Sequence, residues 1–247
     1  MSILKTKLVK WLKEQLGDST AVIGISGGKD SSVVAALCVE AVGKDKVLGV
    51  LMPNGEQKDI MDATLLVEHL GIKSVLYNIE HVMTAFNEGF RKTQDFKRPI
   101  DNYCYKTNTP ARIRMTVLYG FAAMIGNARV MNTSNASEAF VGYCTKWGDN
   151  VGDLFPLINL TVEEVVSLGK ELGLPDRLVN KAPSDGMSGK PDETILGFSY
   201  KNVDRCIEMK FDKVDKEIKD KIAEKAVAAQ HKWFLMERGE AMFKWDR

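Results

Sequence analysis

The chain of 247 residues has no hydrophobic run long enough to cross a membrane and no strong excess of either charge. Its apolar stretches all fall short of the roughly 18–20 residues that a membrane-spanning helix needs. The 34 Lys and Arg residues nearly balance the 33 Asp and Glu residues, which gives a formal net charge of +1. Nucleic acid and anionic membranes attract strongly basic proteins, so we expect neither as the main partner.

Cysteine is scarce and scattered. The four cysteines, Cys38, Cys104, Cys144 and Cys206, form no CxxC pair, which argues against a zinc ribbon or a disulfide scaffold. The first residues, "MSILKTKLVKWLKEQLGDST", alternate apolar and charged side chains at helical spacing and do not have the pattern of a signal peptide. We therefore expect a cytoplasmic protein with reduced thiols.

Apolar strands alternate with amphipathic helices along the first half of the chain. Strands are predicted at 21–26, 46–53, 74–80 and 128–134, with helices at the N-terminus, at 30–43 and at 57–70. Strands that are apolar along most of their length indicate a parallel sheet with both faces covered. We predict an α/β fold with a doubly wound parallel sheet flanked by helices, in a single domain over residues 1–247.

The remaining segments carry weaker signals. Residues 81–108 are expected to be irregular, and the polar, turn-rich stretch "RKTQDFKRPIDNYCYKTNTP" is a candidate mobile connection. A helix should follow, with Thr109 as its N-cap and Pro110 at its first position. Further helices are predicted from Thr161, ending at Gly173, and within 212–239, and residues 183–191 are the most loop-like segment.

The segment most informative about function has the sequence "IGISGGKDSS" and begins at residue 23. A strand, a glycine-rich turn and a helix N-terminus together make an anion site, because unpaired N–H groups point outward there. Gly27 and Gly28 can adopt positive φ without strain, which allows successive N–H groups to converge. Asp30 would repel a phosphate unless Mg²⁺ lay between them.

Two familiar phosphate-binding motifs fit this segment poorly. The nucleotide-kinase P-loop needs Lys followed by Ser or Thr, whereas Lys29 is followed by Asp30. The dinucleotide fingerprint G-x-G-x-x-G fits only in part. A tight strand-to-helix turn, with Asp30 as an ordinary helix-start carboxylate, remains the structural alternative.

The "SGGKDS" run resembles the pyrophosphate-binding loop of the ATP pyrophosphatase group. Within that group the chain resembles ammonia-dependent NAD synthetases, through "PARIRM", "NTSNASEAFVGYCTKWGDNVGDLFPL", "LGLPDRLVNKAPSDG", "DETILGFSY" and the late "HK". The resemblance implies a Rossmann-like fold of the adenine-nucleotide-hydrolase type, a homodimer, and a ligase of NAD biosynthesis. That ligase converts nicotinic acid adenine dinucleotide (deamido-NAD) to NAD with ATP, Mg²⁺ and ammonia, by way of an acyl-adenylate.

The resemblance also assigns roles to individual residues. The implied ATP contacts are Gly24, Ile25, Ser26, Gly27, Gly28, Lys29, Asp30, Ser31, Thr133 and Ser184. Asp30, Ser26 and Ser31 would act in catalysis, and Asp30 and Glu138 would hold Mg²⁺. The implied deamido-NAD contacts are Arg112, Lys146, Asp153, His231 and Lys232. Positioning and charge neutralisation should dominate such a reaction, which suits a chain with three histidines and no Ser-His-Asp pattern.

Each of these residues also fits a simpler structural role. Glu138 could merely start a helix. Arg112 and, more readily, Arg114 could form ordinary surface ion pairs. Lys146 and Asp153 could be solvated loop charges, and His231 and Lys232 could belong to a charged helix face.

The sequence departs from the family pattern at Val162, where a lysine is common. Loss of that cation would cost about 1.5–3 kcal/mol of phosphate binding unless another cation replaces it. Lys29 and Lys181 are the candidate replacements. Ser184 stands where a threonine is usual and keeps the hydroxyl, and residues 184–191 are a candidate lid.

Two other functions are compatible with the same residues. One is a different ATP pyrophosphatase that adenylates a tRNA base or another carboxylate, and the other is a non-catalytic adenine-nucleotide-binding module. Glutamine-hydrolysing relatives of this family carry an N-terminal amidase domain. Because the first expected strand starts near residue 21, we expect no such domain here and free ammonia as the nitrogen source, with a separate glutaminase partner as the alternative supply. The apolar stretch "VLYGFAAMIG" could form a dimer surface or pack inside the monomer.

Overall fold

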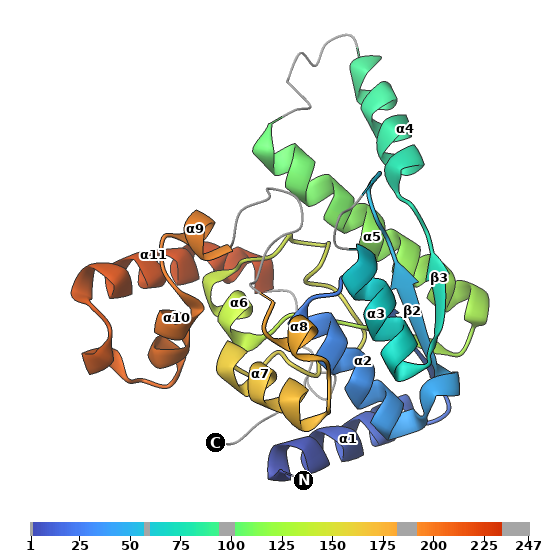
Figure 1. The fold of residues 1–247 in the computed structure, drawn as a ribbon. Helices are drawn as coiled ribbons and strands as arrows, with labels where there is room; N and C mark the ends of the chain where they lie inside the picture. Colours follow the sequence, from blue (N-terminus) through green and yellow to red (C-terminus); the bar gives the residue numbers. More distant parts are fainter. Residues whose placement is uncertain (1, 57–59, 94–101, 182–191, 234–247) are drawn as a thin grey trace.

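The structure, a computed structural model, describes residues 2–56, 60–93, 102–181 and 192–233 (Figure 1). The described residues form a four-stranded sheet in the order β3-β2-β1-β4, with every pairing parallel. The strands are β1 (Thr20–Gly24), β2 (Val47–Leu51), β3 (Lys73–Leu76) and β4 (Ala128–Met131). This confirms the predicted doubly wound α/β fold, with strands shorter than expected.

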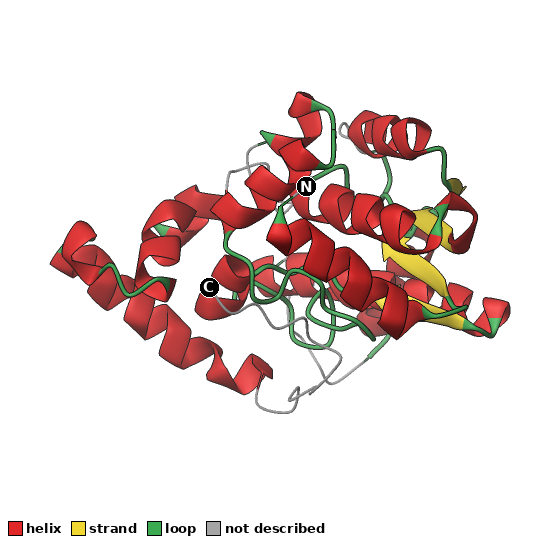
Figure 2. Ribbon diagram, turned by 90° about the horizontal axis from the view of Figure 1, so that it is seen from below, coloured by secondary structure: helices red, strands yellow, loops and turns green. Residues whose placement is uncertain are grey.

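Helices cover both faces of the sheet, as Figure 2 shows. On one face lie α1 (Ile3–Leu16), α2 (Lys29–Val42), α3 (Ile60–Leu70), α7 (Val162–Glu171) and α8 (Asp176–Val179). On the other face lie α4 (Glu80–Arg91) and α5 (Tyr103–Ile125). Alternate residues of β1 account for this, because Ala21 and Ile23 pack into the first core and Val22 into the second.

Two of the predicted helices begin and end close to where the sequence signals place them. Thr161 caps α7 through a reciprocal capping box with Glu164. That helix ends at Glu171, and Gly173 follows with a φ of +71°. α3 ends at Leu70, where Gly71 has a φ of +61°. Local capping chemistry therefore sets these boundaries.

The predicted start of α5 at Pro110 is wrong. The helix begins at Tyr103, and the Asn102 side chain caps it by accepting a hydrogen bond from the N–H of Tyr105 at 2.9 Å. Pro110 lies inside the helix, where it has no N–H to donate to the carbonyl of Lys106. The expected irregular connection over 81–108 is also wrong in part, since α4 and the first turns of α5 occupy much of it.

A smaller group of helices packs beside the sheet, drawn in orange and red in Figure 1. It contains α9 (Asp192–Leu196), α10 (Tyr200–Ile207) and α11 (Lys216–Trp233), which pack with α6 (Ala136–Val141) around Tyr200 and Val203. Short 3-10 turns, η1 (Lys44–Lys46) and η2 (Phe211–Lys213), precede β2 and α11. The expected C-terminal helix therefore starts later than residue 212. No helix in the described part of the chain has the length and apolar character to cross a membrane.

The order of the strands fixes where a ligand should bind. The chain runs outward from β1 to β2 and β3, then returns on the other face to place β4 beside β1. Open parallel sheets bind ligands at the carboxyl ends of the strands where the order reverses in this way. In this protein that position lies between the ends of β1 and β4.

Candidate active site

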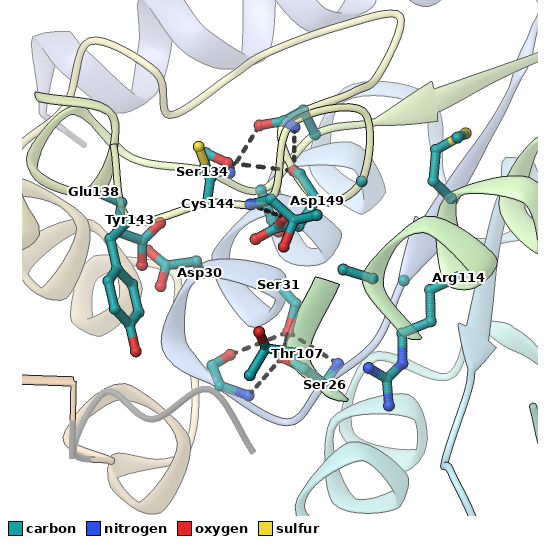
Figure 3. A pocket seen from close by; sticks show the side chains of 18 of the residues that line it. Ser26, Asp30, Ser31, Thr107, Arg114, Ser134, Glu138, Tyr143, Cys144 and Asp149 are labelled. Atoms are coloured by element: carbon teal, nitrogen blue, oxygen red, sulfur yellow. Dashed lines mark hydrogen bonds between the residues drawn. The ribbon is translucent and has the colours of Figure 1, made fainter. Parts of the chain in front are cut away.

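A cavity opens at the point where the strand order reverses. One wall comes from the loop after β1 and the start of α2, including Gly24, Ile25, Ser26, Gly28, Lys29, Asp30 and Ser31. A second wall comes from the segment after β4, including Asn132, Thr133, Ser134 and Glu138. Figure 3 shows the Asp30 and Glu138 carboxylates from these two walls lying close to one another. The structure thus brings the two predicted metal carboxylates together.

The conformation of the glycine-rich loop depends on Gly27. Its φ is +73°, and a Cβ at this position would lie 2.6 Å from Cβ of Asp62 and 2.7 Å from the backbone N of Ala63. Gly28 differs from the prediction of positive φ, because its φ is −87° and it serves as the N-cap of α2. Since glycine has no capping side chain, the N–H groups of the first turn remain available to an anion from the cavity.

The two predicted catalytic serines form one hydrogen-bonded unit. The Ser26 and Ser31 hydroxyl oxygens are 3.0 Å apart, and the Ser31 hydroxyl also accepts from the N–H of Ser26 at 3.3 Å. The N–H of Gly28 donates to the Ser26 hydroxyl at 3.2 Å. Ser31 is buried whereas Ser26 is exposed. Ser31 therefore fixes the shape of the loop, and Ser26 lies exposed in the cavity wall.

Asp30 is held by partners on both sides. Its Oδ2 lies 2.7 Å from Nζ of Lys29, and its Oδ1 accepts from the Asn135 amide at 3.0 Å. Lys29 is buried, which by itself lowers the pKa of its amine, but the charges of Asp30 and Glu138 outweigh burial and raise that pKa. Lys29 is therefore a charged ammonium within this acidic group.

Glu138 shares this environment and has a second, structural role. Its Oε2 accepts from the N–H of Asn135 at 3.3 Å, and its own N–H donates to Asn135 Oδ1 at 3.0 Å, which forms a capping box on α6. Burial, and then the charge of Asp30, raise the pKa of Glu138 from 4.5 to about 8. Two carboxylates held this close repel one another, and a bound cation would relieve that repulsion.

The donor set fits Mg²⁺ that is shared with a phosphate ligand. Within the described residues, no group of three or more His, Cys, Asp or Glu side chains is arranged to hold a metal by itself. Mg²⁺ is commonly bound through one or two carboxylates together with substrate phosphates and water. Asp30 and Glu138 would be those carboxylates.

Arg112 and Arg114 exchange the roles that the sequence suggested. Arg114 lines the cavity and donates from Nε to the carbonyl of Met52 at 2.9 Å. Arg112 is exposed outside the cavity and donates from Nε to the carbonyl of Lys146 at 3.1 Å. Two positions along a helix turn a side chain by about 200°, so α5 presents only one of the two to the cavity. A contact between Arg112 and substrate stays a prediction.

Lys146 and Asp153 also lie outside the cavity lining. The Lys146 ammonium is 5.4 Å from the centre of the Trp147 ring. Asp153 uses one carboxylate oxygen to accept from the N–H of Val130 at 2.7 Å and the other to accept from the Tyr119 hydroxyl at 3.1 Å. Asp153 thus joins β4 to α5, which is a structural role that the sequence did not suggest.

The neighbours His231 and Lys232 also differ in whether they reach the cavity. Lys232 lines the cavity, and its ammonium donates to the carbonyls of Gly142 at 2.6 Å and Cys144 at 2.7 Å. His231 is exposed, with Nδ1 2.8 Å from the carbonyl of Ala228. Lys232 therefore holds α11 against the segment after α6.

Three further positions that the sequence singled out are Thr133, Ser184 and Val162. Thr133 lies in the cavity wall as predicted, whereas Ser184 and the candidate lid at 184–191 lie outside the described residues. Val162 packs against the apolar group around α6 and α10, and its N–H donates to the Ser137 hydroxyl at 3.1 Å. The first turn of α7 accordingly offers no cation here.

Sequence reasoning missed Asn135 and Asp192. Asn135 orients Asp30 and caps α6, and the spacing N-x-x-E with Glu138 was a recognisable capping signal. Asp192 is buried in the cavity wall, and its charge acts on both Lys29 and Glu138. No local pattern marks Asp192, because it reaches the site only through the packing of α9.

The fold and the site define a class of protein first. A doubly wound parallel sheet carries an open helix N-terminus, a positive-φ glycine and paired carboxylates at its switch point. This arrangement is typical of α/β proteins that bind the phosphates of a nucleotide.

Comparison with known proteins narrows the class to a family. The sequence profile of the NAD synthase family matches residues 4–238. The NH(3)-dependent NAD(+) synthetase of Pyrococcus furiosus is 41% identical over 213 residues, which cover 84% of this chain and 79% of that one. That of Methanocaldococcus jannaschii is 41% identical over 216 residues, which cover 85% and 81%. The chain therefore belongs to the NAD synthase family.

Solved structures agree with this assignment. An NMN synthetase from Francisella tularensis superposes with a TM-score of 0.84 at 34% identity, covering 93% of this chain and 94% of that one. An NH3-dependent NAD synthetase from Campylobacter jejuni superposes with a TM-score of 0.75 at 26% identity, with the same coverage.

Proposed function

We propose that this chain is an ammonia-dependent NAD synthetase, a ligase that amidates deamido-NAD to NAD and cleaves ATP to AMP and pyrophosphate. The observation that supports this most directly is the convergence of Asp30 and Glu138 beside the open N-terminus of α2, in a chain of the NAD synthase family. A non-catalytic nucleotide-binding module would not need two carboxylates that repel one another.

In the first step the nicotinate carboxylate attacks the α-phosphorus of ATP, and pyrophosphate leaves. The N–H groups at the start of α2, with the Ser26 hydroxyl, bind the leaving pyrophosphate and stabilise the charge that develops on it. Mg²⁺, when bound, would supply further charge neutralisation at the phosphates. The Lys29 ammonium and the Asn135 amide hold the Asp30 carboxylate in a fixed direction.

In the second step ammonia displaces AMP from the acyl-adenylate. None of the three histidines, His69, His81 and His231, lines the cavity within the described part of the chain. Catalysis by orientation of the reactants, without a histidine base, is consistent with that lining. The exposed Arg112 and the half-buried Lys146 would meet substrate only where it extends beyond the cavity.

The assembly and location of the enzyme follow from the same proposal. We place it in the cytoplasm as a homodimer, with ATP, deamido-NAD and ammonia as its small-molecule substrates. On α5, Leu118 and Phe121 pack toward the sheet, whereas Met124 is 74% exposed and is available to a second subunit. The four cysteines are free thiols, as a reducing compartment requires.

A second candidate function has one specific observation in its favour. The Francisella tularensis structure, which superposes with the higher TM-score of the two described, is an NMN synthetase. The same two steps would amidate nicotinic acid mononucleotide, since its carboxylate is the same and only the adenylate half of the dinucleotide is missing.

Incubation with ATP, Mg²⁺, ammonium and either nucleotide separates these candidates. NAD synthetase activity predicts NAD and equal AMP from deamido-NAD, with kcat/KM higher than for the mononucleotide. The reverse preference would assign NMN synthesis. ADP as product would exclude α-phosphate chemistry, and absence of turnover with both nucleotides would favour a binding module.

A further inference from the structure

Asp62 is a buried carboxylate shared by two cations. It lies in the first turn of α3 and is 6% exposed. Its Oδ1 is 2.7 Å from Nε of Arg177, and its Oδ2 is 2.8 Å from Nζ of Lys181. Arg177 belongs to α8, and Lys181 comes after Asn180, the C-cap of that helix.

Asp62 is ionised between these two cations. Burial raises the pKa of Asp62, but the ion pairs with Lys181 and Arg177 outweigh burial and lower that pKa below its ordinary value. Asp62 is therefore an anion, and it attracts both cations and fixes the positions of their side chains.

The cluster adjoins the glycine-rich loop. Backbone and Cβ atoms of Asp62 and Ala63 pack so closely on Gly27 that no side chain fits between them. Lys181 lines the same cavity as Gly28 and Asp30, and its side chain is 24% exposed. Arg177 binds the same carboxylate but is not part of the cavity lining, and its side chain is 69% exposed. Of these two cations, Lys181 is therefore the one placed to reach a ligand in the cavity.

The other cations of the described cavity lining are less suited to a phosphate at the loop. Lys29 is buried against Asp30, and Lys232 is held by two carbonyls. Arg114 donates to the Met52 carbonyl, and Lys225 lies exposed on α11. Val162 places an apolar side chain at the start of α7.

We propose that Lys181, oriented by Asp62, binds the pyrophosphate portion of ATP and neutralises its charge as it leaves. The inference rests on the proposed function of the cavity. An ammonium has three N–H donors, so Lys181 can keep its bond to Asp62 and still donate to phosphate oxygens. Asp62 is then a positioning residue that fixes one cation relative to the loop.

The test compares two lysine variants with an arginine control. Binding of inorganic pyrophosphate with Mg²⁺, and separately of AMP, is measured by calorimetry for the wild type and for K181M, K181R and R177M. Loss of a charge-assisted contact should weaken pyrophosphate binding by about tenfold to a hundredfold in K181M. AMP binding should be unchanged, K181R should recover much of the pyrophosphate affinity, and R177M should stay within about twofold of wild type.

R177M serves as the matched control because K181M and R177M each remove one of the two cations that pair with Asp62. Equal loss of pyrophosphate affinity in K181M and R177M, or no loss in K181M, would overturn the inference while leaving the proposed function intact. A wild type that binds neither pyrophosphate nor an ATP analogue would overturn both.

The role of Asp62 is tested by a double variant. If Asp62 acts through Lys181, D62N/K181M should bind pyrophosphate no more weakly than K181M alone. A further loss in the double variant would mean that Asp62 supports the loop independently of Lys181, and would overturn the positioning role.

Discussion

Substitution of Gly27 by alanine tests whether the loop conformation creates the phosphate site. Two separate costs arise at this position. The φ of +73° is unfavourable for any residue with a Cβ, and the new Cβ would lie 2.6 Å from Cβ of Asp62 and 2.7 Å from the N of Ala63. Neither neighbour is a flexible side-chain end, so the loop or α3 has to move.

The expected magnitude follows from these two costs. Left-handed backbone costs about 1–2 kcal/mol for a residue other than glycine. Carbon atoms prefer separations of about 3.5–4.0 Å, so the backbone must shift by roughly 1 Å, and such overpacking costs about 1–3 kcal/mol. The sum of about 2–5 kcal/mol corresponds to a fall in Tm of roughly 4–20 °C for a chain of this length.

Gly173 provides a matched control. Its φ is +71°, but no atom lies within 4 Å of the position that a Cβ would take. Gly173→Ala should therefore lower the free energy of unfolding only through its left-handed backbone, by about 1–2 kcal/mol. The difference between the two variants in free energy of unfolding, measured with urea, gives the steric cost at Gly27. Titration with a non-hydrolysable ATP analogue measures how each variant binds nucleotide.

A backbone shift of about 1 Å is enough to cost on the order of a hundredfold in a positioned site. We expect Gly27→Ala to lose binding of the ATP analogue to about that extent, and Gly173→Ala to retain it. The reasoning would be refuted if Gly27→Ala unfolded at the same urea concentration as Gly173→Ala and bound the analogue like the wild type.

Two further predictions concern the walls of the cavity. In metal-free protein the folded state holds a proton on Glu138 that the unfolded state releases, since the pKa of Glu138 is about 8 when folded and near 4.5 otherwise. The free energy of unfolding should therefore fall as pH rises from about 4.5 through 8. Glu138→Gln should lack this slope in urea unfolding at a series of pH values, and equal slopes in both proteins would contradict the assignment. The second prediction concerns the neighbours Lys232 and His231. Lys232→Met removes the donor to the Gly142 and Cys144 carbonyls and should lower the free energy of unfolding by about 1–3 kcal/mol, whereas His231→Ala at an exposed position should change it by less than about 0.5 kcal/mol. Equal thermal stability of the two variants would show that the Lys232 contacts are not structural.

Features that depend on a few neighbouring residues could be predicted from the sequence. The strand, the loop and the helix around Gly27 follow one another in the order that the sequence indicates, and Thr161 caps α7 as expected. The family resemblance paired Asp30 with Glu138, and that pairing agrees with ligand binding at the carboxyl ends of parallel strands. The predicted start of α5 was wrong because Asn102 and Thr109 are both residues that favour an N-cap, and the local sequence does not choose between them.

The amino-acid sequence by itself determined the alternation of strands and helices and the chemistry of the phosphate loop, since hydrophobic period, glycine and capping residues act over a few positions. Only the tertiary structure decided that Arg114 faces the cavity in place of Arg112, that Asp153 joins β4 to α5, and that Asp62 holds Lys181 beside Gly27. Those contacts join residues far apart in the chain, and their existence depends on how whole helices pack against the sheet, which no local pattern encodes.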